Sequence, residues 1–202
     1  MRILEQTLKR LTDLRWLNLF EVDYEHASGA RGKWQFVSRR PHPALSSEPL
    51  SPDAVFIVPL LQTPHGLRLV MTKEFRVPLG DYEYSFPAGL KEPDEDIEVT
   101  IRRELAEETG LALTNIVTAS PAVVTSAGLA DETAVIAFVE CEGTPHNRNL
   151  DGLEEIELLL LDFGEVRKLR KSPVKFSAKA WLVLLMFDAL GRIDRPDRFK
   201  QP

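Results

Sequence analysis

The chain has 202 residues, of which 44% are hydrophobic and 28% charged, so it has the size and composition of one soluble domain with an appendage. Its 25 basic and 31 acidic residues give a net charge of -6, which argues against a general nucleic-acid-binding or membrane-surface protein. The single cysteine, Cys141, excludes an internal disulfide framework and predicts a cytoplasmic protein.

The N-terminal region predicts a small β unit. The opening segment, MRILEQTLKRLTDLRW, is charged and amphipathic and lacks the apolar centre of a signal peptide. Apolar and aromatic residues at 14–25 and 33–38 predict two strands joined by a turn at HASGARG. The proline- and serine-rich stretch 39–52 predicts a linker. We therefore expect an N-terminal β unit with linker at 1–50 and a main domain at 51–202.

The main domain predicts a mixed α/β layer fold. Residues 54–75 contain two apolar runs around TPHG, a strand–turn–strand pattern, and YEYSF at 82–86 predicts a further short strand. Ile97, Ile101 and Leu105 recur every four residues and predict a helix that stops at Gly110. Strands are expected in NIVTASPAVVTS, TAVIAFVEC and IELLLLDF. The apolar run 180–190 is too short to cross a bilayer and predicts a buried final helix.

The expected helix carries an unusual acidic face. Glu104 and Glu108 are four residues apart and project from the same side, with Glu107 beside them. Like charges at this spacing destabilise a helix. The residues alone are consistent either with a solvated acidic face or with a site for Mg²⁺, which prefers carboxylate oxygens. The four histidines are scattered, so a zinc site is not indicated.

The glycine, arginine and glutamate residues around this acidic face follow a fixed spacing. From Gly89, five residues lead to Glu95 and seven more to the pair Arg103-Glu104, which Leu105-Ala106-Glu107-Glu108-Thr109-Gly110-Leu111 follows. This pattern matches the Nudix box at every fixed position, and the sequence therefore resembles a Nudix hydrolase. The resemblance implies an α/β/α sandwich with a mixed sheet, in which the box forms a loop, a helix and a loop. It also implies hydrolysis of a nucleoside diphosphate linked to another group, with Mg²⁺ or Mn²⁺ as cofactor.

The same resemblance implies roles for the box residues. Glu104, Glu108 and the backbone carbonyl of Ala88 would bind metal, and Glu107 would lie close to the same ions. Arg103 would orient a catalytic glutamate through charge-assisted hydrogen bonds. Two further residues would shape the loop: Gly89 would allow a tight backbone turn, and Glu95 would brace the loop rather than bind metal.

Resemblance extends before the box to the ADP-ribose and nucleotide-sugar pyrophosphatase branch. The segment TKEFRVPLGDYEYSFPAGL at 72–90 is similar to the corresponding segment of those enzymes. It implies that Arg76 contacts the substrate, as a guanidinium suits phosphate or ribose oxygens. The branch also exchanges an N-terminal β unit within a homodimer. Trp34 and Phe36 could then stack on a base, or could instead belong to a core.

The loop TSAGLADE at 125–132 is similar to a loop that carries a catalytic glutamate in this branch. Ser126, Gly128 and Glu132 fit its spacing, which implies substrate contact near Gly128 and a general base or extra metal ligand at Glu132. Two departures affect substrate identity: Ala127 stands where proline is common, and Ser85 stands where glutamate is often found. Glu83, on the same strand face as Ser85, is a possible substitute.

The sequence predicts a Mg²⁺-dependent pyrophosphatase that splits ADP-ribose or another nucleoside diphosphate sugar into a nucleoside monophosphate and a sugar phosphate. An alternative is a Nudix enzyme for GDP-mannose, a dinucleoside polyphosphate or a damaged nucleotide. A non-catalytic nucleotide-sugar sensor is a third reading, against which the intact acidic face argues.

Overall fold

The computed structural model describes residues 1–45, 50–150 and 155–190, so the C-terminal segment at 193–202 and part of the expected linker lie outside the described residues. Within it the chain forms two compact units. The first comprises residues 1–53 together with 122–134, and the second comprises 54–121 and 135–202. The first unit thus contains the predicted N-terminal region and also the loop at 125–132.

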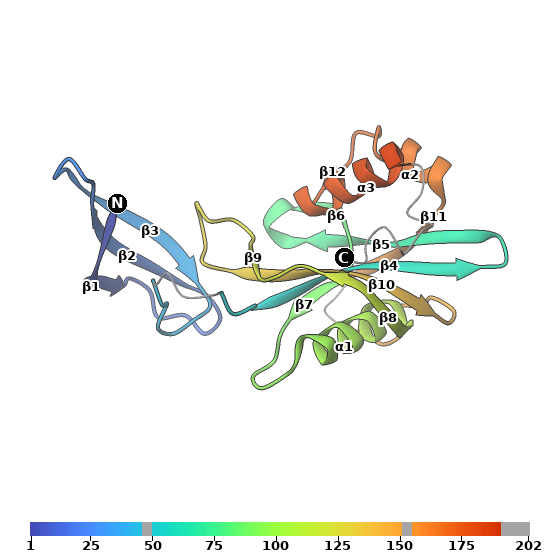
Figure 1. Cartoon of the computed structure of the whole chain (residues 1–202), viewed down its shortest axis with the longest axis horizontal. Helices are drawn as coiled ribbons and strands as arrows, with labels where there is room; N and C mark the ends of the chain where they lie inside the picture. Colours follow the sequence, from blue (N-terminus) through green and yellow to red (C-terminus); the bar gives the residue numbers. More distant parts are fainter. Residues whose placement is uncertain (46–49, 151–154, 191–202) are drawn as a thin grey trace. The chain divides into compact units, whose positions relative to one another are not determined.

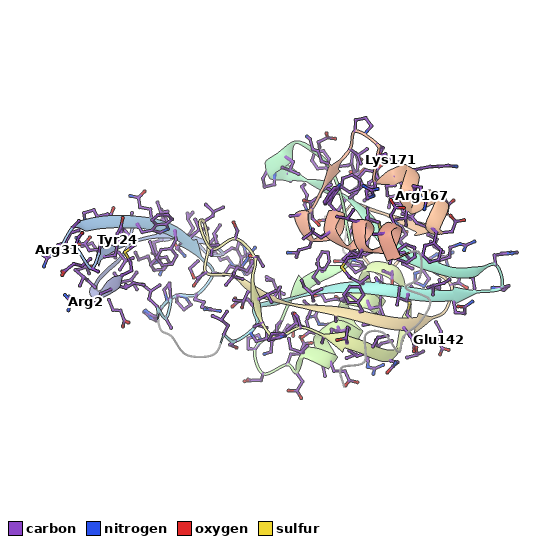
Figure 2. All side chains as sticks on the ribbon, turned by 45° about the horizontal axis from the view of Figure 1, so that its top comes forward. Arg2, Tyr24, Arg31, Glu142, Arg167 and Lys171 are labelled. Carbon is purple, nitrogen blue, oxygen red and sulfur yellow. The ribbon has the colours of Figure 1, made fainter. Side chains whose placement is uncertain are left out.

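The first unit is built on an antiparallel sheet in the order β1-β2-β3 (Figure 1). Its strands are β1 (Arg2–Arg10), β2 (Asn18–Glu25) and β3 (Arg31–Ser38), and the short β9 (Val123–Val124) pairs with the beginning of β10 (Thr133–Glu142). Phe20, Val22 and Phe36 form its small core, to which Leu8 and Leu45 add. At the sheet's hairpin end Arg2 and Arg31, labelled in Figure 2, both form ion pairs with Glu25.

Two sequence expectations for this unit need correction. The N-terminal segment forms strand β1, which we did not predict, and β2 begins at Asn18 rather than near residue 14. The Asn18 side chain explains the later start, because its amide accepts a hydrogen bond from the Leu14 backbone N–H and donates one to the Leu14 carbonyl. This local ring holds residues 14–18 in a turn.

The second unit is a mixed sheet with helices on both faces. Its central path runs β12-β6-β5-β4-β10-β8, with β11 paired to β5 and β7 paired to β4. The remaining elements are β4 (Ala54–Thr63), β5 (Gly66–Arg76), the 3₁₀ turn η1 (Val77–Leu79), β6 (Asp81–Ser85), β7 (Ala88–Leu90), α1 (Ile97–Thr109), β8 (Ala112–Ala119), β11 (Ile156–Leu161), α2 (Phe163–Leu169), β12 (Lys175–Phe176) and α3 (Ala178–Leu190). The predicted strand–turn–strand at 54–75 is the β4–β5 hairpin.

The two faces of this sheet hold separate cores, and Figure 1 shows α1 on one face and α2 with α3 on the other. Ile101 and Leu105 of α1 are fully buried in one core, as their four-residue spacing predicts. Leu184 and Phe187 of α3 are fully buried in the other, with Val166 of α2. The architecture is the α/β/α sandwich that the sequence resemblance implied.

The C-terminal helices differ from expectation in two respects. Helix α3 is buried on one face only, since Leu182 is 56% exposed. Helix α2 was not predicted, although Asp162 and Glu165 form a complete capping box that is visible in the sequence. Arg167, labelled in Figure 2, ties α2 to α3 by an ion pair with Asp188. No helix in the described part of the chain is long and apolar enough to span a membrane.

Candidate active site

The acidic face of α1 lies at the edge of the core. Ile101 and Leu105 anchor the helix to the sheet, and Glu104 and Glu108 are each only 8% exposed. The helix ends at Gly110, whose φ of 69° is left-handed, as predicted. The burial of Glu104 and Glu108 argues against a plain solvated face, because buried carboxylates need charged or hydrogen-bonding partners.

Arg103 organises the carboxylates around it. Its Nε and Nη2 donate to the two oxygens of Glu95 at 3.0 and 3.1 Å, and Nη2 also donates to the Leu90 carbonyl. Its Nη1 donates to Glu104 at 2.7 Å and to Glu107 at 3.2 Å. Arg103 thus contacts Glu104 and Glu107 directly, and its role in orienting a catalytic glutamate stays a prediction.

The hydrogen bonds between Arg103 and Glu95 shift the pKa values of both groups. Hydrogen bonds from Arg103 are the main cause that lowers the pKa of Glu95 to about 2, and the same bonds raise the pKa of Arg103. Glu95 also accepts hydrogen bonds from the Glu92 backbone N–H and the Thr100 hydroxyl. Glu95 thus joins the box loop to the helix, which agrees with its predicted bracing role.

Gly89 lies directly beneath the Glu104 carboxylate. A Cβ added at Gly89 would lie 1.9 Å from both Cδ and Oε1 of Glu104. Gly89 lies within strand β7 and does not have a positive φ, so the tight turn expected at this residue is wrong. The residue is needed because the carboxylate approaches the backbone where any side chain would stand. This contact also brings Glu104 beside the Ala88–Gly89 segment of β7.

The donor set around this contact suits a hard divalent cation. Glu104 and Glu108 share one helix face, and the Ala88 backbone carbonyl belongs to the strand segment that Glu104 contacts. Carboxylate and carbonyl oxygens are the ligands that Mg²⁺ prefers. Among the described residues no three Asp, Glu, His or Cys side chains are arranged to hold a metal ion, and Glu104 and Glu107 both contact Arg103. The oxygen donors of Glu104, Glu108 and Ala88 are nevertheless of the type that fits a magnesium or manganese site.

A second group of predicted residues meets on β5 and β6. Arg76 donates to Glu74 at 2.6 Å and to Glu83 at 3.4 Å, so two expected substrate residues, Arg76 and Glu83, contact each other. Ser85 is buried, and its hydroxyl donates to Ser177. Ser85 is thus occupied within the fold, whereas the Arg76 side chain is 40% exposed.

The loop with Glu132 belongs to the first unit. The Glu132 carboxylate accepts hydrogen bonds from Arg39 Nε at 3.3 Å and from the Thr125 hydroxyl at 3.2 Å. Sequence reasoning missed Arg39, because it lay within a segment interpreted as a linker. The neighbouring pair Arg39-Arg40, next to a strand end, was the available signal. Gly128 is exposed, and a Cβ there would meet nothing within 4 Å.

Trp34 and Phe36 occupy different environments in the same unit. Phe36 is buried and stacks on Phe20, with ring centroids 5.7 Å apart. Trp34 is about half exposed. Both line an apolar cavity of about 390 Å³, together with Val22, Tyr24, Leu45 and Ala127. Of the two aromatic residues, Trp34 is thus the more exposed, and stacking on a base stays a prediction.

Comparison with known proteins agrees with this geometry. Residues 50–182 match the NUDIX domain family. The chain belongs to the Nudix family. It is 31% identical over 153 residues to the putative nudix hydrolase 2 of Caenorhabditis elegans. The aligned region covers 73% of this chain and 67% of that protein.

Two further similarities point in the same direction for this Nudix hydrolase. It is 32% identical over 164 residues to the ADP-ribose pyrophosphatase of Bacillus subtilis, across 81% of this chain and 80% of that protein. A crystal structure of an ADP compounds hydrolase superposes with a TM-score of 0.71 at 21% identity, across 95% of this chain and 96% of that one. The latter likeness supports the fold.

Proposed function

We propose that this Nudix hydrolase cleaves the diphosphate of ADP-ribose or a related nucleoside diphosphate sugar, giving a nucleoside monophosphate and a sugar phosphate. The observation that carries the proposal is the Arg103 cluster, in which Glu104 is held over Gly89 by a 2.7 Å hydrogen bond. Similarity to the Bacillus subtilis ADP-ribose pyrophosphatase supports the substrate class.

We assign Mg²⁺, with Mn²⁺ as a substitute, to Glu104, Glu108 and the Ala88 carbonyl. When bound, the cation supplies charge neutralisation for the diphosphate oxygens and lowers the pKa of a bound water. Arg103 holds Glu104 and Glu107 in one orientation, so the carboxylates do not have to reorganise from a disordered state. A net charge of -6 is compatible with an anionic substrate because positive charge is supplied locally.

We assign proton abstraction from the attacking water to Glu132. Its carboxylate lies on a loop whose Thr125 and Glu132 backbones are hydrogen-bonded, which limits the loop's conformations. Arg39 holds one carboxylate oxygen, and the other is held by the Thr125 hydroxyl, a weaker partner. A carboxylate held in this way can give up the hydrogen bond from the Thr125 hydroxyl and accept one from the attacking water instead.

For the substrate we assign Arg76 to phosphate or ribose oxygens, with Glu83 and Gly128 as further contacts. Trp34, beside the buried Phe36 in the lining of the same cavity, is assigned to stacking on the base. We also propose a homodimer. Large apolar side chains of the first unit are exposed, including Trp16 at 68% and Leu14 at 62%, and exchange of this unit between protomers would cover them. The buried single thiol, Cys141, supports a cytoplasmic location.

A substrate panel tests the proposal. ADP-ribose, other nucleotide sugars, GDP-mannose, dinucleoside polyphosphates and oxidised nucleotides are compared with Mg²⁺ and with Mn²⁺, and products are identified by chromatography. We expect ADP-ribose or another nucleotide sugar to have the highest kcat/KM. A clear preference for a dinucleoside polyphosphate or damaged nucleotide would overturn the substrate assignment; the departures at Ser85 and Ala127 make this the second candidate.

The catalytic assignment is tested by Glu108→Gln, which keeps the side-chain volume and removes the charge. We expect kcat to fall by about 100-fold or more, as when a principal transition-state contact is lost. Glu98→Gln is the matched control, because Glu98 lies on the same helix and pairs only with Arg102 among the ion pairs of the described residues. Unchanged turnover in Glu108→Gln would place the active site elsewhere.

A further inference from the structure

The connection between β10 and β11 crosses the C-terminal end of α1. Its described residues are 143–150 and Glu155, and it begins with Gly143 at a φ of 116°. The His146 backbone N–H donates to the Thr109 carbonyl at 2.8 Å. The Asn149 side-chain amide donates to the Ala106 carbonyl at 2.9 Å. Two donors from this segment thus reach the last turn of the helix that carries the acidic face.

The last turn of a helix has carbonyls without partners inside the helix. Here Gly110 N–H and the Asn149 amide both donate to the Ala106 carbonyl, while the His146 N–H takes the Thr109 carbonyl. Ala106 and Thr109 immediately flank Glu107 and Glu108. The segment therefore holds the backbone on both sides of these two carboxylates.

The His146 ring completes the contact by packing on Gly110. A Cβ at Gly110 would lie 2.5 Å from the ring, so the glycine provides the room as well as the left-handed conformation. Nδ1 of the ring is buried and makes no hydrogen bond to any residue in the described part of the chain. Within these residues the ring's role is close packing, which a glycine at this position permits.

We propose that His146 and Asn149 are positioning residues of the active site, acting through the helix end. We call the pair His146 and Asn149 the C-terminal clamp. The clamp fixes the last turn of α1 and so sets the direction in which Glu107 and Glu108 leave the helix. This inference rests on the proposed role of Glu104 and Glu108 as cation ligands, because its consequence is tighter cation binding.

Mn²⁺ binding without substrate gives the direct test, measured by the loss of the free-ion electron paramagnetic resonance signal. Asn149→Ala removes one hydrogen bond to the helix, and we expect Mn²⁺ to bind about fivefold more weakly. Asn149→Asp places a second acceptor at the negative end of the helix and should weaken binding further. His146→Ala should act in the same direction as Asn149→Ala by loosening the Gly110 contact.

Asn147→Ala is the matched control. The Asn147 amide donates to the Ile156 carbonyl at 2.8 Å, so this variant removes a similar hydrogen bond from the same segment without touching α1. We expect its Mn²⁺ affinity to stay within about twofold of wild type. In steady-state assays Asn149→Ala should need more Mg²⁺ for half-maximal rate yet recover near-normal kcat at saturating Mg²⁺, which loss of folded protein would not produce.

Wild-type Mn²⁺ affinity in all Asn149 and His146 variants would overturn the clamp, as would equal weakening in Asn147→Ala. Failure of the substrate assignment can be distinguished from failure of the clamp. If no nucleotide sugar is hydrolysed but Asn149→Ala and Glu108→Gln both weaken Mn²⁺ binding, the clamp stands and the proposed substrate is wrong. If the Glu108→Gln variant binds Mn²⁺ as tightly as the wild type does, the ligand assignment and the clamp are both wrong.

Discussion

Gly89→Ala tests the contact on which the active-site geometry depends. The added Cβ would lie 1.9 Å from Cδ of Glu104, whereas non-bonded carbon atoms settle at about 3.5 Å, so the carboxylate must retreat by about 1.6 Å. Metal–ligand distances tolerate only about 0.2 Å. Since a misplacement of about 1 Å can reduce a rate about 100-fold, we expect kcat/KM to fall by at least that factor.

The fold should survive this change. The backbone at Gly89 is accessible to alanine, and the group that must move is the end of a side chain, so we expect overpacking to lower the free energy of unfolding by about 1–3 kcal/mol. The assay combines nucleotide-sugar hydrolysis, Mn²⁺ titration and urea denaturation. Gly164→Ala in α2 is the control, because its Cβ would meet Asp162 at 3.3 Å, far less closely. Normal hydrolysis and Mn²⁺ affinity in Gly89→Ala would refute the reasoning.

Three further predictions concern separate parts of the molecule. Because Arg103 lowers the pKa of Glu95 from 4.5 to about 2, their ion pair stabilises the fold fully above about pH 4.5, and this stabilisation is lost as the pH falls towards 2. Glu95→Gln should therefore have a lower free energy of unfolding than wild type at pH 7. In urea titrations the difference between the two proteins should shrink between pH 4.5 and pH 2. Burial raises the pKa of Cys141 to about 12, so a thiol reagent at pH 8 should label the native protein only as fast as it unfolds. Asp53→Ala leaves Arg40 without the carboxylate that it contacts at 2.7 and 2.8 Å and should lower the free energy of unfolding by about 1–2 kcal/mol in urea denaturation.

The elements that sequence predicted well are those with local causes. Helix α1 follows from the spacing of Ile97, Ile101 and Leu105, and its end follows from Gly110. The β4–β5 hairpin follows from two apolar runs around a turn, with Thr63 opposite Gly66. Each of these patterns reports on neighbours within a few residues. The acidic face could be located for the same reason, since Glu104 and Glu108 are one helical turn apart.

Elements with distant causes were missed. Strand β1 has little buried surface of its own and exists because it pairs with β2, with a register shift between Leu4 and Lys9 that breaks any regular alternation. Arg39 reaches Glu132 across 93 positions of the chain. Partners at such separations are set by sheet pairing, and the sequence of one strand does not specify which residue will lie opposite it.

The two glycines of the box show what a fixed spacing can and cannot convey. The pattern places Gly89 fifteen residues before Glu104, and from sequence we interpreted that glycine as a turn. In the structure it is the place where the Glu104 carboxylate meets the backbone, and Gly110 is likewise the place where His146 meets the helix end. A spacing can therefore record a steric contact between β7 and α1 without revealing its nature. The same reasoning makes His146, remote in sequence from the box, part of the geometry that the box requires.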